Sequence, residues 1–207
     1  MPGDFGVFAP VFESAHGYLA LLRLSSADCV DAVRLVRRCA SADVDRADEL
    51  GLLGDLNWRP TLVAAVAALF LPPDPRIATA LWRRFDAGSW VVPQIAVVLS
   101  EVDPDFLTEA RRRLEAHCPL DCAELQSLAM AERHTAAGPE GSAARSAKAA
   151  GSLQAVVSSL TPPPGWLSAV LASPDHQDLV SSDMDSGGRI ALEWSGRMKD
   201  LRQQFEA

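Results

Sequence analysis

The sequence contains few aromatic residues and few cysteines for its length. Of its 207 residues, 6% are aromatic, one is Tyr and four are Cys. The surplus is in Ala, Leu and Val, and because strands favour aromatic and β-branched side chains, this balance favours packed helices over a sheet sandwich. Four Cys are too sparse for a disulfide framework in a chain of this length, which agrees with a reducing compartment.

Long apolar runs and an excess of basic residues are also missing. The most apolar run, residues 62–71, has about half the length that a membrane-spanning helix requires. The first ten residues lack the basic start and the apolar core of a signal peptide, so we expect a cytoplasmic protein without a membrane segment. The formal net charge of −8 argues against broad binding to nucleic acid and suits a basic partner or plain solubility.

The chain lacks the motifs of the common catalytic and cofactor sites. It has no phosphate-binding Gly-x4-Gly-Lys, no dinucleotide-binding Gly-x-Gly-x-x-Gly and no zinc-protease His-Glu-x-x-His. We therefore expect no cofactor and no enzyme activity.

Residues 85–94, FDAGSWVVPQ, place an acid and a serine together in a short polar stretch. A nucleophile on a turn would need a base within reach, and the G-x-S-x-G spacing of a nucleophile elbow is missing. Helix punctuation accounts for the same residues, with Gly88 ending one helix and Ser89 capping the next. Asp86 stays open, because it could either cap backbone groups or face a partner.

Self-comparison reveals a repeated segment. Residues 74–85 (DPRIATALWRRF) and 103–114 (DPDFLTEARRRL) share Asp-Pro at the start, Thr at the sixth position and Arg-Arg before a final apolar residue. A fainter copy, residues 28–39, keeps the leading Asp and the Arg-Arg ending. All three copies predict helices of about three turns.

The shared residues have a physical role at the ends of these helices. We expect Asp74 and Asp103 to cap the helix starts, with Pro75 and Pro104 in the first turn. Pairs of arginines belong in the last turn, where cations complement the helix dipole. These pairs are Arg37-Arg38, Arg83-Arg84 and Arg112-Arg113.

Apolar segments with Trp and Pro precede the two clearer copies. Residues 57–69 and 89–99 are apolar nearly all round, which predicts inner helices covered on more than one side. Each unit is then an inner helix, a short turn and an amphipathic outer helix. This pattern resembles HEAT-type α-helical repeats over about residues 26–116, although isolated helical hairpins with an accidental similarity remain an alternative.

The resemblance implies an all-α fold, a short right-handed stack of antiparallel helical hairpins (an α-solenoid) followed by a C-terminal helical segment. We expect residues 1–130 to form the helical-repeat core, beginning with one helix over residues 11–24. Residues 131–152 are rich in Ala, Gly and Ser, which predicts a loop, a linker or a marginal helix. Residues 153–207 are expected as helices on the core in one overall domain, with an apolar stripe on the final helix.

Two tryptophans and their neighbours are the candidate residues for binding a partner. The set is Asp55, Trp58, Arg59, Asp86 and Trp90. Trp and Arg could bind another protein, or they could fill gaps between helices and satisfy helix dipoles. The leading hypothesis is a non-catalytic protein that binds a basic protein partner, similar in kind to immunity proteins that block a toxin. The alternative is a HEAT-like nucleic-acid enzyme with a rib of arginines and stacking tryptophans.

Two further clusters have the composition of ion sites. His117, Cys118, Cys122 and His134 offer the ligand types that zinc selects, but no second pair stands at the usual spacing, so buried cysteines are the competing interpretation. Residues 43–49, DVDRADE, lack the Gly and closing Glu of a calcium loop. We expect these seven residues to form a solvated linker face.

Overall fold

The computed structural model describes residues 5–14, 17–55, 57–116, 139–174, 176–177 and 188–206. Within these ranges every regular element is a helix, which confirms the all-α fold class. The first elements are η1 (Gly6–Phe8), α1 (Ala9–Glu13), α2 (Gly17–Arg23), α3 (Cys29–Ala42), α4 (Ala47–Gly54) and α5 (Trp58–Ala68). The others are α6 (Pro75–Asp86), α7 (Val92–Val102), α8 (Phe106–Glu115), α10 (Pro139–Ser159), α11 (Leu167–Leu171) and α13 (Arg189–Glu206).

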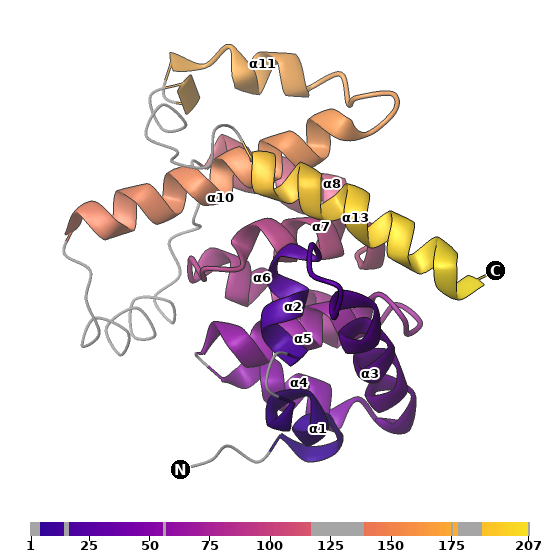
Figure 1. Cartoon of the computed structure of the whole chain (residues 1–207). Coiled ribbons are helices and arrows are strands. Elements are labelled where there is room, and N and C mark those ends of the chain that lie inside the picture. The colour runs from indigo at the N-terminus through magenta and orange to yellow at the C-terminus, as the bar shows by residue number, and fades with distance from the viewer. Residues whose placement is uncertain are drawn as a thin grey trace.

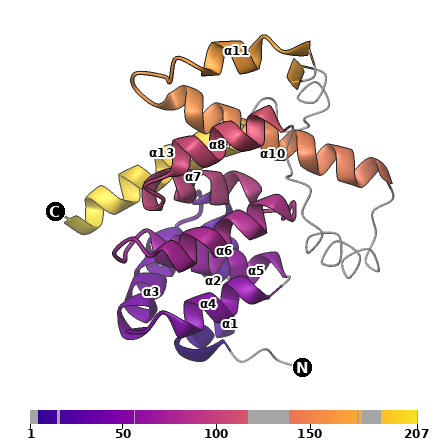
Figure 2. The same ribbon diagram turned by 180° about the vertical axis from the view of Figure 1, so that it is seen from behind.

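Helices α5 and α7 form the interior, as their apolar sequences predict. Every residue from Pro60 to Ala68 is buried, and so is every residue from Val92 to Leu99. α7 packs against α5 and α6 and also against α10 and α13, which cross it together (Figures 1 and 2). A helix covered on several sides must be apolar on several faces, so the composition of α7 follows from its central place.

The start of α6 is as the sequence predicts, whereas the start of α8 is not. An Asp74 carboxylate oxygen accepts a hydrogen bond from the backbone N–H two residues on, at 2.8 Å, and Pro75 is the first helical residue. Asp103 makes the same local bond to Asp105, at 3.0 Å, but α8 begins at Phe106. A turn separates the acid from the helix, because the Asp103 carbonyl accepts from the Phe106 N–H at 3.1 Å.

Two predictions concern the turn between α6 and α7. The helix end at Gly88 is confirmed, and the cap at Ser89 is wrong. Gly88 follows α6 with φ +73°, the left-handed conformation that commonly ends helices. Ser89 does not cap α7, which begins three residues later at Val92. The Ser89 hydroxyl is buried and has no hydrogen-bond partner in the described part of the chain. Its carbonyl instead accepts from the Val92 N–H at 3.1 Å.

The prediction of one helix over residues 11–24 is wrong, because α1 ends at Glu13 and α2 begins at Gly17. Ser14 has an extended backbone, which interrupts the helical hydrogen bonds. Gly17 lies against the carbonyl of Val11 with no space for a Cβ atom. The chain can therefore fold back on α1 here because the residue is glycine.

Of the alternatives for residues 131–152, the loop and the linker are wrong from Pro139 onward, where the chain forms the helix α10. Residues 131–138 lie outside the described ranges. Ala147, Ala150 and Leu153 are fully buried. Small side chains let a helix approach its neighbours closely, so α10 packs on α7 without the wide apolar stripe that would have predicted it.

The apolar stripe of α13 docks on the helices before it, as expected. Trp194, Met198 and Leu201 are buried, and the Trp194 indole donates to the carbonyl of Leu21 at 2.9 Å. The C-terminal helix thus closes over α2 and α7 (Figure 1). No helix in the described ranges is long and apolar enough to cross a bilayer.

Candidate functional site

A row of aromatic rings runs over α1, α2 and the start of α5. The rings of Phe12 and Tyr18 lie 6.1 Å apart between centroids, and Tyr18 meets Trp58 edge to face, also at 6.1 Å. The Arg59 guanidinium lies over both Trp58 (4.9 Å) and Tyr18 (5.6 Å). The three rings are partly exposed and Arg59 is exposed. We call these four residues the aromatic row.

Carboxylates stand beside the aromatic row. Glu13 follows Phe12 directly, and Asp55 precedes α5 and accepts from the Asn57 N–H at 2.8 Å. Both acids are exposed. The structure thus places Asp55, Trp58 and Arg59, three of the residues singled out from the sequence, on one surface.

Sequence reasoning missed the other two members of the row, Phe12 and Tyr18. They are about 40 residues from Trp58 along the chain, and no local spacing links them. Tyr18 reaches Arg59 through the packing of α2 on α5, and Phe12 reaches Tyr18 through the packing of α1 on α2.

Asp86 does not face an open surface. The side chain is 8% exposed, and its two oxygens accept from Arg113 at 2.8 and 2.7 Å. Arg113 is itself 3% exposed, lies 3.9 Å from the Trp82 ring centroid, and also pairs with Glu109. The residue offered from the sequence as a possible cap or partner contact is instead half of an internal ion pair between α6 and α8.

Burial and pairing act in opposite directions on the carboxylates of this cluster. Burial raises the pKa of Asp86 by more than the hydrogen bonds from Arg113 lower it. Burial also acts to raise the pKa of Glu109, but there the hydrogen bonds from Arg113 and Arg112 outweigh it, and the pKa lies below its usual value. The side chains of Asp86 and Arg113 therefore pair inside the fold and have little contact with solvent.

The last two arginine pairs of the rib, which belongs to the alternative nucleic-acid interpretation, are each divided between interior and solvent. Arg84 and Arg113 are 5% and 3% exposed, whereas their neighbours Arg83 and Arg112 are exposed. The interior member of the last pair is held by carboxylates. The last turns of α6 and α8 thus each offer one cation to solvent, half of the number that the sequence suggested.

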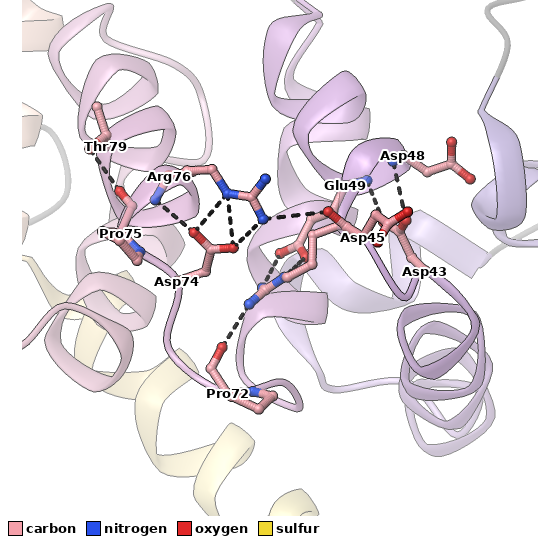
Figure 3. A network of polar contacts seen from close by, with 10 residues as sticks. Asp43, Asp45, Asp48, Glu49, Pro72, Asp74, Pro75, Arg76 and Thr79 are labelled. Atoms are coloured by element: carbon pink, nitrogen blue, oxygen red, sulfur yellow. Dashed lines mark hydrogen bonds and ion pairs between the residues drawn. The ribbon is translucent and has the colours of Figure 1, made fainter.

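A second internal pair occupies residues 43–49, where a solvated linker face was expected. Arg46 donates to both oxygens of Glu49 at 2.8 and 2.9 Å and to the Pro72 carbonyl at 2.7 Å. Asp43 accepts from the Glu49 N–H at 2.8 Å at the start of α4 (Figure 3). Glu49 is fully buried, so the linker interpretation is wrong, and burial raises the pKa of Glu49. The network joins α4 to the loop before α6.

Trp90 occupies a different kind of surface from Trp58. It is 79% exposed and lines a pocket of about 520 Å³. The Lys148 amine lies 5.8 Å from the Trp90 ring centroid and donates to the Trp90 carbonyl at 3.2 Å. Trp90 therefore stands apart from the aromatic row, beside a cation of α10.

The proposed zinc ligands His117, Cys118, Cys122 and His134 lie outside the described residues. Within the described ranges, no group of three or more His, Cys, Asp or Glu side chains is arranged to hold a metal ion. The cysteines that the structure places, Cys29 and Cys39, are buried and unpaired with each other. They pack as small apolar residues on α3.

Comparison with known proteins yields no match, whether the chain is set against protein-family models, curated proteins or solved structures.

Proposed function

We propose that the protein is a non-catalytic binding protein, built on a HEAT-like stack of helical hairpins, that holds a basic protein partner on the aromatic row. The observation that carries this proposal is the packing of Tyr18 and Trp58 under the Arg59 guanidinium, with Phe12 against Tyr18, at partly exposed positions.

The composition of the row matches the residues that carry binding energy at protein interfaces. Tyr, Trp, Phe and Arg are enriched in interface centres, where a few of them supply most of the affinity. Rings that already pack on one another lose little side-chain freedom when a partner binds. Trp58 and Tyr18 are ordered by each other and by Arg59, so their exposed faces are preorganised.

Charge supports a basic partner. Glu13 and Asp55 flank the row, and the chain as a whole carries a formal net charge of −8. Complementary charge speeds encounter and disfavours wrong partners. A small acidic helical protein without catalytic machinery is similar in kind to immunity proteins, and we propose a cognate toxin as the partner.

The test uses the product of the gene beside the one that encodes this chain, co-expressed and purified with it. We expect wild-type protein to form a stoichiometric complex and to relieve any growth inhibition by that product. Arg59→Ala and Trp58→Ala should each weaken the complex by about thirtyfold, the effect of losing an interface hot spot.

Arg83→Ala is the matched control, because Arg83 is an exposed arginine of α6 outside the aromatic row. It should leave affinity unchanged. Thermal unfolding of each variant separates lost binding from lost folding. Equal affinity of wild-type protein and Arg59→Ala, with both folded, would place the interface elsewhere and contradict the proposal.

A further inference from the structure

The pocket beside Trp90 is lined by residues that are not part of the aromatic row. It lies between the end of α2, the start of α7, α10 and the first half of α13. Figure 1 shows α10 and α13 crossing α7 together, and the pocket opens where these helices meet the end of α2. Its volume of about 520 Å³ is in the range of sites for small organic molecules.

The pocket is basic on an acidic protein. Its lining includes Arg23, Lys148, Arg189 and Arg197, with Glu193 as the one carboxylate among its lining residues. The nearest approach of Glu193 to Arg197 is 4.0 Å. Cations concentrated in a concave site focus their field and favour an anion. The α13 helix also begins here, so its N-terminal dipole adds to the positive potential.

One of these cations is held in place by the protein itself. The Arg197 guanidinium donates to the carbonyl of Arg23 at 2.7 Å, which fixes α13 to the end of α2 across the pocket. Holding the guanidinium by one nitrogen leaves its other nitrogens for a further acceptor. The basic lining is therefore partly preorganised.

Trp90 supplies a flat apolar surface beside these charges. At 79% exposure its ring keeps most of its area in water, although large apolar side chains usually bury theirs. An exposed indole next to cations is the combination with which proteins stack a ring that carries an anionic group. The ligand that fits Trp90 is therefore both flat and anionic.

One residue that lines the pocket, Gln94, has an acceptor atom without a donor among the described residues. Gln94 is 2% exposed, and its amide nitrogen donates to the carbonyl of Leu22 at 2.9 Å. Exchanging the amide oxygen and nitrogen would set two acceptors against each other, so Oε1 is the atom left over. Gln94 Oε1 has no partner among the described residues. Buried acceptors are nearly always satisfied, and a ligand N–H at this point would satisfy it.

We propose that this pocket binds a small anionic ligand whose flat ring carries an N–H, the chemistry of a nucleoside monophosphate. The phosphate lies among the arginines of α2 and α13, the base stacks on Trp90, and a ring or exocyclic N–H donates to Gln94 Oε1. The site is separate from the aromatic row and does not depend on the protein interface proposed there.

Isothermal titration with AMP and GMP, at about 50 mM salt where phosphate contacts are strongest, tests the proposal. We expect a dissociation constant of about 100 μM or tighter for at least one of them, and binding at least about tenfold weaker for adenosine and for inorganic phosphate alone. Trp90→Ala and Arg189→Ala, both at exposed residues, should each weaken binding by about tenfold.

Gln94→Met removes the acceptor at similar volume and should weaken nucleotide binding while leaving phosphate binding unchanged; its melting temperature reports whether it folds. Arg59→Ala is the control from the aromatic row and should bind nucleotide as wild-type protein does. The proposal is overturned if neither nucleotide binds at about 5 mM, if phosphate alone binds as tightly, or if Trp90→Ala and Arg189→Ala bind like wild-type protein.

Discussion

In the α5–α6 pair the acid before the second helix bonds to an exposed arginine of that same helix, whereas in the α7–α8 pair its counterpart bonds to a buried tryptophan of α6. Asp74 pairs with Arg76, which is exposed and reaches the Asp45 carbonyl at 3.4 Å (Figure 3). Asp103 accepts the indole N–H of Trp82 at 2.6 Å. Both acids connect their own helix to the preceding structure, but only Asp103 does so through its own side chain.

The C-terminal ends of α6 and α8 are also linked by side chains. Arg113, in the last turn of α8, reaches back to Asp86 at the end of α6, so the second pair holds the first. The C-terminal half of α6 is therefore held at two points, by Asp103, which precedes α8, through Trp82 and by Arg113 of α8 through Asp86. Equivalent positions in a sequence repeat acquire unequal energetic weight because each unit packs on a different neighbour.

The largest loss in the free energy of unfolding should come from Arg113→Met. Methionine fills similar space but leaves the Asp86 carboxylate buried without its cation, and breaking a buried pair in this way costs about 3–5 kcal/mol. Urea unfolding followed by circular dichroism measures the loss. Arg112→Met is the matched control one residue away, where the side chain is exposed and paired with Glu109, and should cost about 1 kcal/mol or less.

Removing both charges of the buried pair tests whether the unpaired charge causes the loss of stability. Asp86→Leu combined with Arg113→Met should recover most of the stability, because an apolar pair of similar volume replaces two buried charges. A double variant as unstable as Arg113→Met alone would show that shape, or the contact of Arg113 with Trp82, matters more than charge.

An intermediate loss of stability should distinguish Asp74 from Asp103, its counterpart in the repeated sequence segment. Asp103→Ala removes the acceptor of the Trp82 indole as well as a local turn bond, and should cost about 2–3 kcal/mol. Asp74→Ala removes a cap near the surface and should cost about 1 kcal/mol. The measurement is the free energy of unfolding in urea for both variants. Equal losses would remove the energetic difference between the two helix pairs.

The smallest predicted effect is the pH dependence of stability. Asp74 and Asp86, at the two ends of α6, should contribute to it in opposite directions. The hydrogen bonds from Arg76 lower the pKa of Asp74, so its contribution to stability is present above the usual carboxyl pKa and is lost as pH falls through the folded value. Burial raises the pKa of Asp86, so its contribution is present in acid and is lost as pH rises through the folded value.

Carboxyl carbon NMR titration tests this pH prediction residue by residue. Asp74 should titrate below an ordinary aspartate, and Asp86 should titrate above it. An Asp86 whose pKa lies as low as that of Asp74 would mean that the hydrogen bonds from Arg113 outweigh burial.

The helices themselves could be predicted where one rule decided the outcome. The apolar segments gave α5 and α7, and the Asp-Pro start gave α6, because burial on all sides and capping are local properties of the chain. α4 was missed, since an isolated Arg and Glu predict solvent exposure and only a surrounding fold buries them as a pair. α10 was only one of three alternatives for its segment, and its packing was missed, because alanines become a packing face only when another helix approaches.

Single residues of the candidate sites could also be selected from the sequence, whereas their neighbours in the fold could not. Trp58, Arg59 and Trp90 stand out in the sequence, since large aromatic and cationic side chains are where binding energy concentrates. Their surroundings do not stand out, because Tyr18 meets Trp58, and Lys148 meets Trp90, only through packing of distant helices. Asp86 was singled out for its place in a turn, and its partner lies 27 residues away on α8.

The sequence by itself determined that this chain is helical, which segments are interior and which residues carry unusual chemistry, because periodicity, capping and composition act over a few residues. Tertiary structure alone decided which charges are buried as pairs, which tryptophan stacks on a neighbour and which stays in solvent. Those outcomes depend on the burial of each group, and burial is set by helices that are far apart in the chain.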